Sequence, residues 1–294
     1  MVPPINDHHI RKFPLTSISV LSPHTGLIIS VVLLVFFFIK FYILELFLLR
    51  KLYGSRYTDL DEVNRRGFVN HHIAGATKLV ILILAAYPFG SVAFGTAGFH
   101  TPYSDGSRVT MGDILIVSAQ MLIGMFIFEL IYRVKISPVS MIHHMASILV
   151  GQVAITISIS KNEDSSIEFL MCTVWGAFDI ISEFIPHLTI ILYRVYPTSH
   201  SFLRSIFRAA CITTLIGTLA ETIVVFFLFG QLWERWMLSF RVATPILHVG
   251  FSIAQLHGTR IFWRMWRKQE RIMREGREDK GEGGGPGDGG MASA

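Results

Sequence analysis

Two adjacent histidines, His143 and His144, stand inside an apolar stretch of this chain, in the run SPVSMIHHMASILV. Histidine is costly in hydrocarbon unless it has a partner or a task. Its neutral imidazole is available near pH 7, so either ring could act as a base, a nucleophile or a polar anchor. Adjacent helical residues point about 100° apart, so we expect one ring to line a cavity and the other to contact a neighbouring helix. Ser147, one turn further on, belongs to the same patch.

A second group of ionisable residues lies in the run WGAFDIISEFIPHL, where Asp179, Glu183 and His187 follow one another at intervals of four. This spacing places all three on one face of a helix. Two carboxylates one turn apart repel each other in a medium of low dielectric, and an apolar stripe would avoid that cost. We therefore favour a functional seam, with a structural polar seam as the alternative.

Further ionisable residues fall inside apolar stretches: Glu45, Glu129, Glu221, His248 and His257. Glu129 precedes Arg133 by four residues, so an intrahelical ion pair explains it as well as a catalytic role does. Glu45 and His257 lie near the ends of their stretches, where water reaches them. Glu221 and His248 lie deeper and match no motif.

A further histidine pair, His71-His72, precedes the second apolar stretch. It either caps the mouth of a bundle, near His143 and His144, or consists of histidines at the membrane interface anchored by Arg65 and Arg66. The second interpretation is favoured, because aromatic and basic side chains are common at that depth.

The elements that carry these residues are predicted to be membrane-spanning helices. Hydrophobic residues make up 51% of the 294 residues, charged residues make up 16%, and the mean hydropathy is +0.51. Seven apolar stretches are each near or above the roughly 20 residues that cross a bilayer as a helix. They lie at about 25–48, 75–97, 111–132, 139–160, 166–193, 206–231 and 236–262. The predicted fold is an all-α, multi-pass transmembrane bundle of about seven helices. Cys172 and Cys211 both lie in apolar stretches, so no disulfide is expected.

The charge pattern predicts the orientation and the domain limits. Lys and Arg gather in alternate connections and after the last stretch, which places the C-terminus in the cytosol and the N-terminus on the lumenal side. Residues 1–24 read as a lumenal segment and 25–48 as a retained first helix. Residues 66–265 form the main six-helix domain. The segment 268–294, basic and then glycine-rich, is predicted to be a disordered cytosolic tail.

The histidine pair and the acidic seam together resemble the core of the TLC-domain family, which includes the ceramide synthases. His143 and His144 match the paired histidines of the synthase signature, Ser147 stands where threonine is expected, and Asp179 and Glu183 match an acid and a glutamate four residues apart. Trp175-Gly176 replaces the His-Asp dipeptide of the synthases, and the polar run between their helices is absent. The chain resembles a non-synthase member over residues 66–265.

This resemblance implies a protein of the endoplasmic reticulum that binds, senses or processes lipids and contributes to membrane lipid homeostasis. Its lipid-binding residues would be His143, His144, Ser147, Asp179, Glu183 and His187. The alternative is an acyltransferase of ceramide-synthase type that takes acyl-CoA as co-substrate, with His143 or His144 as nucleophile or base and Asp179 in support. We expect membrane lipids as partners, no bound cofactor, no metal and no nucleic acid, and leave homo-oligomerisation open.

Two other classes of membrane protein fit less well. A seven-helix receptor shares the layout, but the chain has neither an Asp-Arg-Tyr triplet after the third stretch nor an Asn-Pro motif in the seventh. A di-iron hydroxylase needs histidine boxes whose spacing gathers ligands on one helix face. The pairs His8-His9, His71-His72 and His143-His144 lack that spacing.

Overall fold

The computed structural model describes residues 18–159, 165–236 and 238–282, and nearly all of them are helical. The first helix is a continuous rod formed by α1 (Thr25–Phe38), a π-helical stretch η3 (Ile39–Leu48) and α2 (Leu49–Tyr53). Gly54, with a φ of 52°, ends it before the short α3 (Ser55–Thr58). The other helices are α4 (Glu62–Ala93), α5 (Met111–Tyr132), α6 (Pro138–Ile159), α7 (Ser165–Val195), α8 (His200–Gln231) and α9 (Leu238–Glu282).

Six helical segments of the described chain are long and apolar enough to cross a membrane, which confirms the all-α multi-pass fold. The seventh predicted span, 236–262, lies in α9, which is less apolar than the other six. Thr244, His248 and Gln255 of α9 are buried in the interior. Residues 238–262 cover about 37 Å at 1.5 Å per residue, which is long enough to span.

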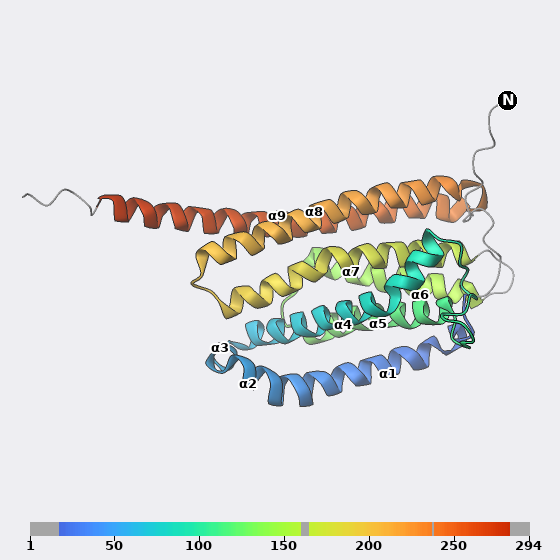
Figure 1. The fold of residues 1–294 in the computed structure, drawn as a ribbon, viewed down its shortest axis with the longest axis horizontal. Helices are drawn as coiled ribbons and strands as arrows, with labels where there is room; N and C mark the ends of the chain where they lie inside the picture. The colour runs from blue at the N-terminus through green and yellow to red at the C-terminus, as the bar shows by residue number, and fades with distance from the viewer. Residues whose placement is uncertain (1–17, 160–164, 237, 283–294) are drawn as a thin grey trace, which may run out of the picture.

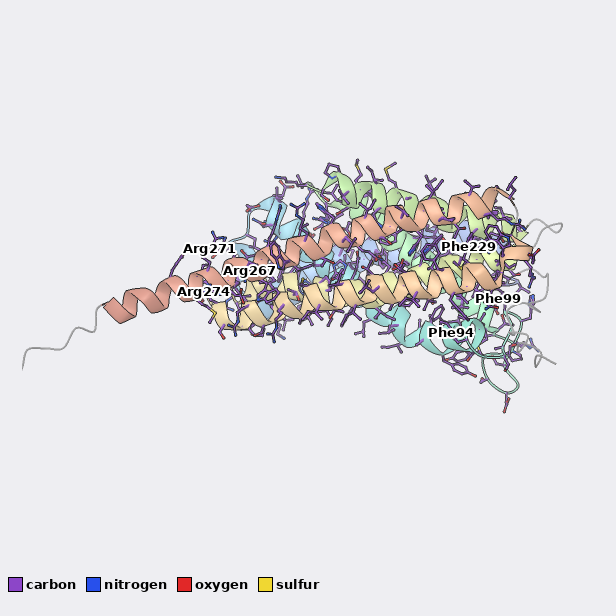
Figure 2. The ribbon with its side chains drawn as sticks, turned by 90° about the horizontal axis from the view of Figure 1, so that it is seen from above. Phe94, Phe99, Phe229, Arg267, Arg271 and Arg274 are labelled. Atoms are coloured by element: carbon purple, nitrogen blue, oxygen red, sulfur yellow. The ribbon has the colours of Figure 1, made fainter. Side chains whose placement is uncertain are left out.

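The helices form a layered bundle with α7 near its centre. α7 packs on α4, α6 and α8, while α1 packs on α5 at one side and α9 packs on α8 at the other. Figure 1 shows this order, with α1 and α9 on opposite sides of the bundle. Figure 2 shows Phe94, Phe99 and Phe229 at one end, and Arg267 and Arg274 at the other. We call the second end, where α4 and α8 begin, the arginine end.

The distribution of side chains is that of a protein surrounded by hydrocarbon. Large apolar residues are exposed on the outer faces of α1, α4, α8 and α9, including Ile83, Ile223 and Ile246. Lys78, Glu129 and Asp179, by contrast, are buried between helices. Intramembrane ionisable groups usually face the interior of a bundle, as they do here.

Several helices extend beyond the apolar stretches that predict them. α8, for example, begins at His200 and not at 206. α4 begins at Glu62, because the Asp61 carboxylate caps it by accepting from the backbone N–H of Asn64 at 2.9 Å. His71 and His72 are therefore helical. α9 continues to Glu282, so residues 268–282, predicted to be disordered, are helical as well. Arg, Lys, Glu and Gln, which dominate there, are good helix formers without being apolar. The segments 1–17 and 283–294 lie outside the described residues.

Candidate functional site

A buried ion cluster joins α4 to α7. The ammonium Nζ of Lys78 donates to Asp179 Oδ2 at 2.8 Å and to Glu183 Oε2 at 2.6 Å. The Lys78 side chain is 0% exposed. The i, i+4 spacing on α7 brings both carboxylates to one cation. The positive charge of Lys78 offsets the repulsion between the two carboxylates that the sequence predicts. We call Lys78, Asp179 and Glu183 the ion cluster.

Histidines extend the ion cluster in both directions. On one side, His143 Nε2 of α6 lies 3.4 Å from Asp179 Oδ1. On the other side, His187 Nε2 lies 3.8 Å from Glu183 Oε2, and His187 Nδ1 lies 2.9 Å from Nδ1 of His71. The seam predicted on α7 therefore exists, and α4 and α6 complete it. His71 joins the seam through His187. One interpretation of the sequence placed His71 and His72 near His143 and His144, but the contact of His71 is with His187.

The two adjacent histidines have different surroundings. His143 lines the interior cavity, whereas His144 is absent from its lining. His144 Nε2 lies 3.5 Å from Glu129 Oε2 on α5, and its ring stacks on Phe126 at 4.7 Å between centroids. Glu129 also accepts from Arg133 Nη1 at 2.5 Å, which confirms the expected intrahelical pair. One histidine of the pair thus faces the cavity and the other joins two helices, as the helical geometry predicted.

The interior cavity lies between α4, α5, α6, α7, α8 and α9, and the space among its lining residues, open solvent included, is about 930 Å³. Its wall is mostly apolar. His143, Ser147, Asp179, Glu221 and Gln255 supply most of the polar lining. Along α6 the lining runs from His143 to Ile155, about 18 Å at 1.5 Å per residue.

The polar and apolar parts of this wall lie toward different ends of the bundle. Because α6 starts at the arginine end, His143 and Ser147 lie toward that end and Ile155 lies toward the other. Phe89 and Leu115 also line the far part. Trp175 and Gly176, which replace the polar dipeptide of the synthases, form part of the wall. The cavity therefore has a polar region and a long apolar region.

Several polar atoms at the cavity wall have no hydrogen-bond partner among the described residues. They are both ring nitrogens of His143, Asp179 Oδ1 and Gln255 Oε1. Two of them, His143 Nε2 and Asp179 Oδ1, face each other at 3.4 Å, so His143 Nδ1 and Gln255 Oε1 are the atoms left without a partner in the described part of the chain. The three side chains belong to residues that are at most 9% exposed. Buried polar groups without partners are costly, and native proteins usually satisfy them with a neighbour, water or a ligand. These atoms mark the place where a polar group of a ligand would be held.

A second polar cluster reaches the cavity from α8 and α9. Gln255 Nε2 donates to Glu221 Oε2 at 2.6 Å, and His248 Nδ1 lies 3.8 Å from Glu221 Oε1. Trp175 Nε1 donates to His248 Nδ1 at 3.4 Å. Glu221 and His248, which matched no motif, thus form one group beside the cavity.

The carboxylates could also be considered as metal ligands. His143, Asp179 and Glu183 offer ligand atoms within 4.8 Å of one another. The ammonium of Lys78, however, already satisfies one oxygen of each carboxylate and would repel a metal cation at this distance. The ion cluster is better suited to positioning His143 than to holding a metal.

Lys78, the residue at the centre of the ion cluster, was not among the predicted site residues. A signal was available: Lys78 follows His71 by seven residues, so both occupy one face of α4. Ser147 was placed correctly in the patch, but its hydroxyl donates to the backbone oxygen of His143 at 2.9 Å. Gln255 was also missed, because nothing in the sequence shows that α9 brings it to Glu221.

Comparison with known proteins adds no relative. No family model matches the chain, and neither the curated proteins nor the solved structures yield a significant match.

Proposed function

We propose that this membrane protein takes a single lipid into the interior cavity, with its head group at His143, Asp179 and Gln255 and its acyl chain along the apolar part of the wall. One observation carries the proposal: the wall of a mostly apolar cavity holds buried polar atoms without a hydrogen-bond partner among the described residues. Pockets with an apolar lining and a few polar groups are typical of small-ligand sites. A molecule with one polar end and a long apolar end would satisfy both parts of the wall.

The charges around the cavity favour a particular kind of head group. None of the described lining residues is Lys or Arg, whereas Asp179 and Glu221 are acids. The buried ammonium of Lys78, which pairs with the cavity residue Asp179, is shared between two carboxylates. A phosphate would meet carboxylates without a free cation, which is costly in a low dielectric. A neutral or cationic head that donates hydrogen bonds suits the acceptors Asp179 Oδ1 and Gln255 Oε1.

The resemblance to the TLC-domain family supports a role in lipid homeostasis and a location in the endoplasmic reticulum, which we include in the proposal. The residues that carry it, His143, His144, Asp179 and Glu183, all belong to the seam or contact it. His144 and Glu183 then act from behind the cavity wall and do not touch the lipid.

A cavity-filling substitution tests the binding of lipid. Ala119 lines the cavity on α5, and Ala119→Phe would occupy its space. Ala209→Phe is the matched control, because Ala209 is exposed on α8. Native mass spectra of the purified proteins should show a bound lipid in the wild type and the control, and at least a tenfold lower occupancy in Ala119→Phe. Equal lipid occupancy in all three folded proteins would refute the proposal.

Acyl transfer is a second candidate function, favoured by the approach of His143 Nε2 to Asp179 Oδ1 at 3.4 Å. A carboxylate beside an imidazole orients the ring and stabilises the imidazolium. In this reaction the C–S bond of an acyl thioester breaks and a C–N bond to a lipid amine forms. His143 takes the proton of the amine, and the thiolate that leaves is protonated in turn.

The adjacent histidines provide the test of acyl transfer. Purified protein would be incubated with a labelled acyl-CoA and a long-chain amine, and the labelled amide would be measured. If the transfer occurs, His143→Ala should abolish it and His144→Ala, with folding verified, should retain most of it. Equal loss of activity in both folded variants, or no amide from the wild type, would exclude His143 as the catalytic base in this reaction.

A further inference from the structure

Five arginines form a straight stripe along the end of α9. They follow one another at intervals of four, three, four and three residues, which is the spacing of a single helix face. All five side chains are exposed. The stripe consists of Arg260, Arg264, Arg267, Arg271 and Arg274, and we call it the arginine stripe.

The opposite face of α9 packs on α8. Phe262 is buried in a small cluster with Leu203 and Phe207, and Trp266 packs against it. The carboxamide Oε1 of Gln269 is paired with His200 Nδ1 at 2.8 Å. These contacts hold the opposite face of α9 against α8. The arginine stripe is therefore turned away from α8 and is open to a partner.

α9 continues past the other helices at the arginine end of the bundle. The pairing of Gln269 with His200 sets residue 269 level with the first residue of α8. Figures 1 and 2 show the last part of α9 projecting beyond the other helices, and Figure 2 labels Arg271 and Arg274 at this end of the molecule. α9 runs alongside α8, so the stripe extends outward from the membrane and does not lie flat on its surface.

The charge of the stripe is largely uncompensated. Arg267 pairs with Glu270 at 2.7 Å. The other four arginines have no carboxylate partner among the residues that the structure describes. Lys268, the lysine of this region, lies off the stripe. Arginine presents a planar fork that binds carboxylates in a bidentate manner, which a lysine cannot do.

The length of the stripe decides between two kinds of anionic partner. From Arg260 to Arg274 it covers about 21 Å at 1.5 Å per residue. The attraction of an anionic lipid surface falls off within a Debye length, about 8 Å at physiological salt. Lipid head groups at the level of Arg260 would therefore not reach Arg271 and Arg274. A partner that lies parallel to α9 would engage all five.

We propose that the arginine stripe is a docking surface for an acidic helical segment of another protein, with its carboxylates at the same alternating intervals of three and four. Two such helices side by side match charge to charge along the full stripe, as the flanking positions of coiled coils do. The partner lies on the membrane face from which α9 projects. This inference does not depend on the lipid in the cavity.

A designed peptide tests the stripe. Full-length protein in neutral nanodiscs would be titrated with a fluorescent helical peptide that carries glutamates at intervals of three and four, and with a peptide of the same composition whose glutamates are distributed around the helix. Removal of four charges by Arg264→Gln, Arg267→Gln, Arg271→Gln and Arg274→Gln should weaken binding of the first peptide at least tenfold.

The control removes four exposed cations elsewhere, by Arg50→Gln, Lys51→Gln, Arg65→Gln and Arg208→Gln, and should leave the affinity within twofold. The patterned peptide should bind the wild type at least fivefold more tightly than the other peptide. Equal binding of the two peptides, or equal loss in both variants, would overturn the proposal. The proposal would also be overturned if the stripe variant bound the peptide as the wild type does and retained less anionic lipid. The stripe would then be a lipid contact.

Discussion

At the scale of residues, the most consequential feature is the lysine that holds two carboxylates in the interior of the bundle. With neutral histidines, the ion cluster carries one positive and two negative charges, a net charge of −1. His143 and His187 flank it at 3.4 and 3.8 Å. The cluster therefore holds Asp179 beside His143. The imidazole of His143 faces this carboxylate on one side and the apolar cavity on another.

Replacing Lys78 by Met should destabilise the protein strongly. The substitution leaves Asp179 and Glu183 buried without their cation, and breaking a buried ion pair costs about 3–5 kcal/mol. We expect a lower apparent Tm in detergent. Unfolding would be measured by the fluorescence of the native tryptophans.

The triple variant Lys78→Met, Asp179→Asn, Glu183→Gln serves as the control, since it removes every charge of the cluster. It should recover most of the Tm lost by Lys78→Met alone, because no uncompensated charge remains. An unchanged Tm in the single variant would mean that the cluster is accessible to water.

At the scale of elements, length and apolar composition were enough to predict most of the helices. α5 matches its predicted limits, and α6 begins and ends one residue before them. The start of α4 and the end of α9 were not predicted, because a cap and good helix formers extend those helices in polar sequence. A cavity at one of the paired histidines was predicted, but the rest of its lining was not, since it comes from six helices whose neighbours are set by packing.

The start of α4 depends on Asp61, so Asp61→Ala should increase hydrogen exchange of the amides at Asn64 and Arg65. Asp59→Ala is the matched control, because the Asp59 carboxylate accepts from the Thr58 hydroxyl and only the backbone of Asp59 caps α3. The backbone N–H of Asn64, and then its side chain, lower the pKa of the Asp61 carboxyl. A lowered pKa means that this stabilisation is present above the unfolded pKa, about 3.9. It is lost as the pH falls through the folded pKa. Unchanged exchange in Asp61→Ala would show that the cap does not hold this turn.

The contact between α7 and α8 depends on Gly217. A Cβ at this position would collide with the side chain of Ser182 on α7. Gly217→Val should therefore force the helices apart and lower the yield of folded protein, since overpacking costs about 1–3 kcal/mol. Gly250→Val on α9, where a Cβ meets nothing within 4 Å, should be tolerated. Similar yields and melting curves for the two variants would contradict this packing.

At the scale of the whole molecule, the bundle is arranged around its polar interior. Apolar side chains face outward, and ionisable residues of α4, α5, α6, α7 and α8 face inward. α9 adds Phe251 and Gln255 to the cavity wall and then extends beyond the bundle. Its inward polar residues explain why it is less apolar than the six other spans.

The orientation of the bundle remains a prediction of its charge pattern. A glycosylation acceptor inserted between Ser104 and Ser107 should be modified, because that connection is expected on the lumenal side. An acceptor fused after Ala294 should remain unmodified. Modification after Ala294 alone would mean that the orientation is the opposite of the predicted one. Modification at both sites would mean that α9 does not cross the membrane.

A cryo-EM structure of the protein in nanodiscs would show directly whether the cavity holds a lipid. We expect elongated density between α5, α6 and α7, with its wider end beside His143 and Asp179 and its tail toward Ile155. A cavity closed by its own side chains, or one in which only water contacts His143, would contradict the proposal.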